Sequence, residues 1–332
     1  MERYITLMRP DLTLFDPNMN VNVTTDNTTG NNLSVEMKTF YSDVLIDLVE
    51  AELVHDQFAQ RHPIPANGGK TIEFRQYDPL PEITTPLTEG VTPDGQNLNV
   101  KNLTATVQQY GGYVTLSDVL MLTAIDNNLV QATELIASQA GRTLDTITRE
   151  VINAGTNVQY AGGAASRAAL ANSDTYHLTV DDIKKAVRTL EAQDAPTING
   201  SYVGIIHPYV KYDLMKDPLW RNPHEYKDTS NVYQNEIGEL YGVRFVQASR
   251  AKVFTGAGAS SADVYSTLIL ADNAYGTTEV TGGGLKHIVK QLGSAGTADP
   301  LDQRATVGWK ALKVAEILIQ QYMVRIESTA TQ

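Results

Sequence analysis

The spacing of hydrophobic residues predicts two helices in the first half of the chain. One lies before residue 50, where large apolar side chains recur three or four positions apart, as on one face of a helix. Its members are Met37, Phe40, Tyr41, Val44, Leu45 and Leu48. A longer helix is predicted from about Asn128 to Asn153, with a stripe of the same spacing. At 1.5 Å per residue, this second helix would be about 35–40 Å long.

An alternating pattern predicts strands on either side of a long connection. Residues 71–77, TIEFRQY, alternate with period two, and a second strand is expected around 103–116. Between them, residues 78–99 are rich in Pro, Thr, Gly and acids and show no periodicity. Connections this long are uncommon inside a compact domain, where they form a lid, a binding loop or an arm supported by a partner. This is the first indication of assembly.

The section 175–280 has a mixed α/β pattern. Thr179 and Asp182 have the spacing of a capping box at the start of a helix. The expected buried face of that helix comprises Val180, Ile183, Ala186, Val187 and Leu190. The runs YVGIIHP, VRFVQAS and VYSTLILA predict short buried strands, the first closed by Pro208. From Leu285 onward, the pattern predicts long strands.

The N-terminal stretch 17–32 is strongly polar, with ten Asn or Thr in sixteen positions. Such a segment has too little apolar surface to offset the entropy lost on ordering. We expect it to be disordered or to be an arm that is ordered by lying on another surface.

Composition narrows the possible functions. The 332 residues include 38 acids and 26 bases, for a net charge of −12, which argues against general nucleic-acid binding. The chain has no cysteine, which excludes disulfides, thiolate metal sites and cysteine nucleophiles. No apolar run approaches 18 residues, so the sequence predicts no transmembrane helix and no membrane partner.

Motifs of catalysis and cofactor binding are incomplete. Gly69-Lys70-Thr71 resembles the end of a phosphate-binding P-loop, but the residues that follow have a strand pattern where a P-loop requires a helix. LGSAG at 292–296 lacks the first glycine of a nucleophile elbow, and GAGAS at 256–260 does not continue as a dinucleotide-binding motif. None of the six histidines lies in H-E-x-x-H. We therefore expect no catalytic, cofactor-binding or metal-binding residues.

The stretch 217–228, DPLWRNPHEYKD, places aromatic residues among bases, as in platforms that stack single-stranded nucleic acid. Its three acids cancel that charge. An exposed loop or a subunit contact at Trp220 is therefore the favoured interpretation.

Several segments resemble the major capsid proteins of tailed bacteriophages with the Hong Kong 97-type fold, and most closely the family named after the coat protein of phage N-four. The segments are MKTFYSDVLI, RHPIPANGGKTIEFRQY, TPLTEGVTPDG, YGGYVTLSDVL, TLDTITREVINAGTN, EIGELYGVRFV and QLGSAGTADPLDQRATVGWKA. They extend from about Leu33 to Glu327, nearly the whole chain. The order of predicted elements agrees with this resemblance.

The resemblance implies an α+β capsid fold and assigns its parts. An N-terminal arm would span 1–32, an N-terminal helix 33–66, and an extended hairpin, the E-loop, 67–116. A peripheral domain containing the long spine helix would combine 117–155 with 285–332, and an axial α/β domain would span 156–284.

The resemblance also implies the function. Members of the family are not enzymes: hexamers and pentamers of one chain close an icosahedral virion shell around double-stranded DNA, without sequence-specific contact to it. Assembly would occur in the host bacterial cytoplasm with separate scaffolding, portal and decoration proteins. The alternatives are an encapsulin-type compartment and a soluble α/β enzyme that binds phosphate at 292–300.

Residues of the expected E-loop, together with Trp220, are the predicted subunit contacts, because an arm without a partner in its own chain should meet the next subunit. The charged members are Lys70, Arg75, Glu82, Glu89 and Asp94. Glu89 has an equally supported alternative as a solvated turn residue before Gly90.

Overall fold

The computed structural model describes most of the chain from residue 53 onward. The described residues are 25–26, 32–33, 53–65, 69–77, 80–123, 128–220, 236–278, 284–294 and 299–331. Within the N-terminal region, β1 (Thr25–Asp26) pairs antiparallel with β2 (Asn32–Leu33). The predicted helix face between Met37 and Leu48, and the rest of the predicted arm, lie outside the described residues.

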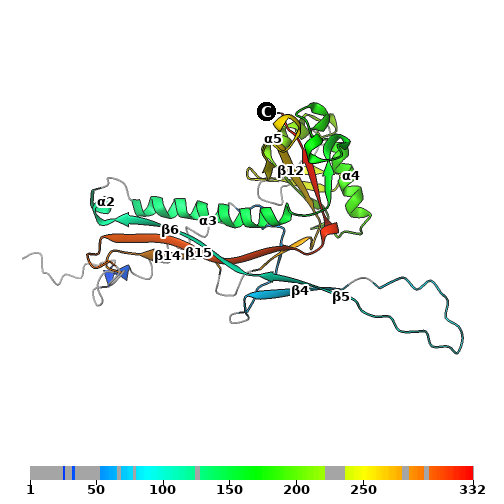
Figure 1. The fold of residues 1–332 in the computed structure, drawn as a ribbon, viewed down its shortest axis with the longest axis horizontal. Coiled ribbons are helices and arrows are strands. Elements are labelled where there is room, and N and C mark those ends of the chain that lie inside the picture. The colour runs from blue at the N-terminus through cyan, green and yellow to red at the C-terminus, as the bar shows by residue number, and fades with distance from the viewer. Residues whose placement is uncertain are drawn as a thin grey trace, which may run out of the picture.

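A long sheet with the helix α3 packed along it forms one half of the body (Figure 1). Its described strands are β3 (Gln60–Arg61), β6 (Gln108–Ser117), β13 (Tyr275–Thr278), β14 (Lys286–Lys290) and β15 (Arg304–Ile317). The predicted long helix is confirmed as α3, Asn128–Ile152, and lies along β15 and β6. Ile136, Ala140 and Leu144 of α3 pack against Val307 and Trp309 of β15. The short helix α2 (Asp118–Thr123) continues directly from β6.

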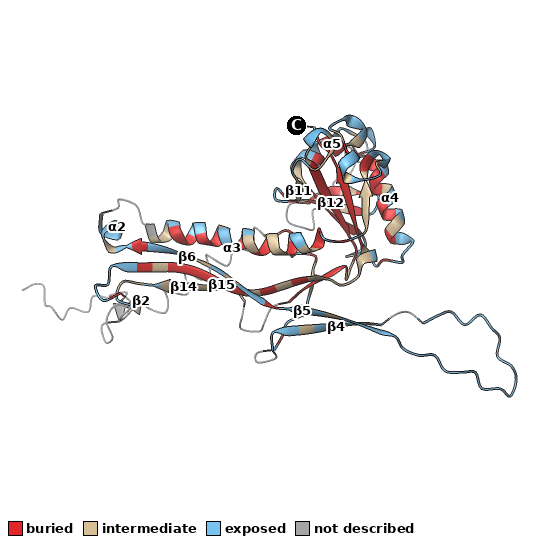
Figure 2. Ribbon diagram, in the orientation of Figure 1, coloured by how far each residue is buried: buried red, intermediate tan, exposed pale blue. Residues whose placement is uncertain are grey.

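The other half is a compact α/β unit around a second sheet. Its described strands run in the order β7-β16-β12-β8-β10-β9, with β11 on β12. They span Val158–Tyr160 (β7), Met323–Ser328 (β16), Val264–Leu270 (β12), Tyr202–Ile206 (β8), Val243–Gln247 (β10), Glu236–Leu240 (β9) and Val253–Phe254 (β11). Strands β8 and β12 are buried along their whole length, as their continuous apolar runs predicted (Figure 2).

The helices of this unit confirm one prediction and correct another. Thr179 caps α4 (Val180–Glu191) through the expected box with Asp182, and the predicted apolar face of α4 is buried. Pro208, expected only to close β8, is the first residue of α5 (Pro208–Lys216). Proline suits that position because the first helical N–H has no partner within the helix.

Short 3-10 turns complete the connections. They are η1 (Ala161–Gly163), η2 (Arg167–Ala169), η3 (Asp174–Tyr176), η4 (Ala259–Ser261) and η6 (Gln320–Tyr322).

A two-stranded hairpin projects from the body (Figure 1). Strand β4 (Thr71–Tyr77) pairs antiparallel with β5 (Val100–Thr106), from Thr71 opposite Thr106 to Tyr77 opposite Val100. Gly69 and Lys70 lead into a strand, which confirms the predicted strand at 71–77.

The predicted single strand at 103–116 is wrong, because the chain divides at Val107 into β5 of the hairpin and β6 of the long sheet. Strand β6 pairs with β15 over ten residues, so the projecting arm ends at Thr106 and not at 116.

The expected boundary between the two halves also needs correction. Strand β13, placed by the sequence in the α/β section, pairs with β15 in the long sheet. Strand β16, placed with the long strands, lies between β12 and β7 in the α/β unit. Alternation shows which residues of a strand share a face but does not identify its neighbouring strand. The sequence therefore could not show that β13 belongs to the long sheet and β16 to the sheet of the α/β unit.

Candidate assembly surfaces

The outer part of the projecting hairpin exposes all of its side chains. Residues 80–99 have no regular secondary structure and every one of them is exposed (Figure 2). The large apolar side chains exposed along the arm are Tyr77, Leu80, Ile83, Leu87, Val91, Leu98 and Val100. Single exposed hydrophobic residues are normal on surfaces, but seven of them on one thin arm indicate a binding surface.

The tip of the arm is acidic. Residues 78–99 contain Asp78, Glu82, Glu89 and Asp94 and no Lys, Arg or His. Glu89 lies in a β-turn, in which the Val91 N–H donates to the Thr88 carbonyl at 3.1 Å. Gly90 has a φ of +78°, as a type II turn requires at its third position. The turn alternative for Glu89 is therefore correct in geometry, and its carboxylate remains exposed and available to a neighbour.

The predicted contact residues do not form one cluster. Lys70 and Arg75 are exposed at the base of the arm, while Glu82, Glu89 and Asp94 are exposed at its tip. Arg75 Nη2 lies 3.9 Å from Glu73 Oε2, and because both groups are exposed this pair adds little stability.

Trp220 is not the exposed contact residue that the sequence predicted. Its side chain is 2% exposed and meets the Phe245 ring edge-on, with centroids 5.5 Å apart, in the core of the α/β unit. A tryptophan that fills a core position cannot also be the exposed contact that the surrounding charges indicated.

A hollow of about 530 Å³ lies where the arm joins the body. Its wall includes Phe74 and Leu103 from the arm and His62 and Leu318 from the body. The His62 and Phe74 rings meet edge-on with centroids 5.3 Å apart. The ring pair is one contact between the arm and the body.

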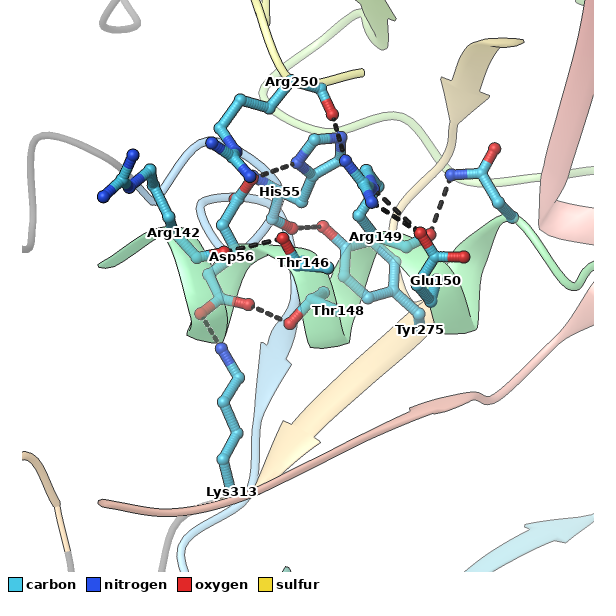
Figure 3. Close-up of polar contacts among 12 residues, drawn as sticks. His55, Asp56, Arg142, Thr146, Thr148, Arg149, Glu150, Arg250, Tyr275 and Lys313 are labelled. Carbon is cyan, nitrogen blue, oxygen red and sulfur yellow. Dashed lines mark hydrogen bonds and ion pairs between the residues drawn. The ribbon is translucent and has the colours of Figure 1, made fainter. Parts of the chain in front are cut away.

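A buried polar junction, which the sequence analysis did not find, fixes the α3 helix to residues 53–61 and to the long sheet (Figure 3). Asp145 accepts hydrogen bonds from the His55 backbone N–H at 2.8 Å and lies 2.8 Å from His55 Nδ1. The Thr148 hydroxyl donates to Asp56 at 2.5 Å, and Asp56 also pairs with Lys313 of β15.

Burial and pairing have opposite effects on the pKa of Asp145 in this junction. Burial raises the pKa of Asp145, but the hydrogen bonds and charge of His55, with the charge of Lys313, hold it below the usual value. Burial, with the nearby Asp56 and Asp145 carboxylates, raises the pKa of Tyr275 well above its usual range. The Tyr275 hydroxyl therefore stays neutral and donates to the His55 carbonyl. The junction is a structural network.

The part of the chain that the structure describes contains no group of three or more His, Asp or Glu residues arranged to hold a metal ion. In the same part, no helix is both long and apolar enough to cross a bilayer.

A family model described as phage capsid protein matches residues 101–320, two thirds of the chain. This chain belongs to the phage capsid protein family. No curated protein sequence matches it. The capsid protein is a structural protein and not an enzyme, which removes the phosphate-binding alternative.

Solved structures show the same fold at low sequence identity. The capsid of Ralstonia phage GP4 is 15% identical with a TM-score of 0.65, over 83% of this chain and 88% of that chain. The capsid of cyanophage Pam1 is 13% identical with a TM-score of 0.63, over 80% and 86%. These similarities confirm the capsid fold class expected from the sequence.

A virus-like particle from Pyrococcus furiosus is also similar, with 12% identity and a TM-score of 0.50 over 88% of this chain and 100% of that chain. The fold is therefore shared by phage capsids and by this particle.

Proposed function

We propose that this capsid protein is the major capsid protein of a tailed phage, and that its hexamers and pentamers close an icosahedral head around double-stranded DNA. The supporting observation is the projecting arm. Seven large apolar side chains and an acidic tip extend from the body without a core of their own, and neighbouring subunits would cover them.

The architecture supports an assignment of the parts of the shell subunit. The arm 71–106 would be the E-loop, the long sheet with α3 the peripheral domain, and the α/β unit the axial domain at capsomer centres. The N-terminal residues 1–32 would form an arm on neighbouring subunits. The net charge of −12 would let packaged DNA move without sequence-specific contact.

The partners and the place of assembly are also proposals. The principal partner would be further copies of this chain. Separate scaffolding, portal and decoration proteins would join them in the host bacterial cytoplasm, and the completed shell would become the virion capsid.

An encapsulin-type compartment is the second candidate, favoured by the structural similarity to the Pyrococcus furiosus virus-like particle. The two candidates predict different contents inside the shell. A phage head would hold nuclease-protected double-stranded DNA after packaging, whereas a compartment would hold a cargo protein and no genome.

The arm provides the test of this proposal. Replacing residues 78–99 with Asn-Gly, which forms a tight hairpin turn and keeps Tyr77 opposite Val100, should leave the folded subunit intact because residues 80–99 are all exposed. It should abolish shells seen by negative-stain electron microscopy. A matched control replaces Ser260 and Ser261, in the exposed 3-10 turn η4, with glycine. Normal shells from the arm variant would contradict the proposal.

A further inference from the structure

The α3 helix belongs to both halves of the molecule. Its middle packs on the long sheet, and its last turn ends against the α/β unit (Figure 1). The Ile152 side chain, at the end of α3, is buried in one cluster with Val203 of β8 and Leu268 of β12. Because α3 is about 37 Å long at 1.5 Å per residue, a tilt of about 5° at this end would displace the other end by about 3 Å. Small changes at the last turn therefore become large displacements along the long sheet.

An arginine from a distant part of the chain caps this end of α3. Asn153 follows the last helical residue, and its carbonyl accepts a hydrogen bond from Arg325 Nη1 on β16. The last carbonyls of a helix have no partner within the helix and carry a partial negative charge, so a cation is favoured there. The Asn153 side chain accepts a second hydrogen bond, at 2.5 Å, from the Ser266 hydroxyl on β12. The end of α3 is thus attached to two neighbouring strands inside the sheet of the α/β unit.

Glu327 holds this arginine in place. Arg325 and Glu327 are two positions apart on β16 and share a face of the strand, with Arg325 Nε 2.9 Å from Glu327 Oε1. Glu327 is fully buried and also accepts from Arg167 of η2, through Nε at 2.7 Å and Nη2 at 2.6 Å. The Arg167 guanidinium in turn lies 3.5 Å from the centre of the Phe254 ring on β11. We call Arg167, Arg325 and Glu327 the ionic cluster.

The ionic cluster supplies direction more than stability. Removing charges from water offsets most of the attraction between them, so apolar side chains of similar volume would stabilise this site as well. A guanidinium is planar and presents its donors at fixed angles. With one part of Arg325 on Glu327 and another on the Asn153 carbonyl, the strand and the helix end are held in one relative orientation.

A second ion pair lies at the same turn of α3 but on the outside. Glu150 Oε2 is 2.6 Å from Lys252 Nζ, and the two side chains are 44% and 25% exposed. Exposed pairs contribute little because water screens them. This pair has the position of the ionic cluster without its burial, and it therefore provides a matched control.

We propose that Arg325 and Glu327 are positioning residues that fix the angle between α3 and the α/β unit, and with it the curvature of the shell. The rotation between neighbouring subunits decides where an assembly closes, and a change of angle within every subunit alters that rotation. This inference rests on the proposed shell function and adds the residues that govern the geometry of the shell.

Shell diameter is the readout, measured by negative-stain electron microscopy of full-length variants under the conditions in which the wild type assembles. Arg325→Met keeps the length of the side chain and removes both contacts, and Glu327→Gln keeps the shape and removes the charge. Arg325→Lys is milder, because a single ammonium group cannot reproduce the fixed fork of the guanidinium. Since a small tilt is amplified along α3, we expect a spread of diameters about twofold that of the wild type, or a second size of shell.

Two controls separate geometry from stability. Lys252→Met removes the exposed pair at the same turn and should leave the diameter unchanged. Val187→Ala leaves a cavity in the core beneath α4, outside the ionic cluster. It should lower the urea midpoint of unassembled subunits while the shells keep the wild-type diameter. The same midpoint is measured for every variant of the cluster.

Each outcome decides the inference. Wild-type diameters from all folded cluster variants would overturn it and leave the shell function standing. An equally broad spread from Val187→Ala would also overturn it, because the effect would then follow stability alone. If all three cluster variants yield no soluble subunit while Val187→Ala does, the cluster holds the fold and not the geometry, and the inference is again overturned. If the wild type forms no shells, the proposed function itself fails and the inference falls with it.

Discussion

Asp145 is the residue on which the buried junction depends most. Its pKa in the folded chain lies below the usual value, so its charge contributes stability above about pH 4, and the contribution is lost as the pH falls through the folded-state pKa. Asp145→Asn keeps the shape of the side chain but removes the charge that faces His55 and Lys313. We expect a loss of about 2 kcal/mol of unfolding free energy at pH 7, because one member of a buried pair is removed.

Urea unfolding of unassembled subunits measures this loss, and the difference from wild type should shrink as the pH falls below about 4. Asp94→Asn is the matched control, because Asp94 is exposed on the arm and should leave the unfolding curve unchanged. A difference that stays constant from pH 7 to pH 3 would show that the Asp145 charge does not stabilise the fold.

The partners of buried charged residues could not be predicted from the sequence. Lys313 lies on the same side of β15 as Trp309 and Ala311, and a charged residue among apolar ones gives no sign of its partner. That partner, Asp56, is distant in the chain. Glu327 is a second case: it is fully buried on β16 and held by both Arg167 and Arg325. In contrast, the capping pair Thr179 and Asp182 was predicted because both members lie within one helical turn.

At the scale of elements, the start of α4 offers a local test. The Thr179 hydroxyl accepts from the Asp182 N–H at 3.3 Å and donates to the Asp182 carboxylate at 2.7 Å. Thr179→Ala removes both bonds and should lower the unfolding free energy by about 1 kcal/mol, as for other N-cap residues.

The control for the cap is Thr189→Ala in the body of the same helix, where the hydroxyl donates only to the Lys185 carbonyl within the helix. This change should be close to neutral, because alanine has the higher helix propensity. Chemical denaturation compares the two variants, and equal stabilities would show that the capping box does not stabilise α4.

Most elements were predicted because their signals are local. The α3 helix was found from its apolar stripe, and β4, β8 and β12 were found from alternation or continuous apolar runs. The pairings of β6, β13 and β16 were missed because they join strands from distant parts of the sequence. Trp220 was misassigned because its neighbours in sequence are charged, whereas its neighbours in space are apolar.

At the scale of the whole molecule, the arm should be the first region attacked by a protease in unassembled subunits. Residues 80–99 are exposed and have no regular secondary structure, and exposed loop tips are preferred cleavage sites. Limited proteolysis followed by mass spectrometry should place the first cut within 78–100, and shells should be resistant there. First cleavage elsewhere in unassembled subunits, or equal sensitivity in shells, would contradict an arm covered by neighbours.

The most direct measurement of the central claim is the assembly state of the purified wild-type chain, followed by sedimentation velocity and negative-stain electron microscopy of the same sample. We predict closed shells of uniform diameter, with six-fold and five-fold clusters of subunits on their surface. A chain that remains a monomer or a small oligomer across protein concentrations and salt conditions, alone and with a scaffolding protein, would contradict the account.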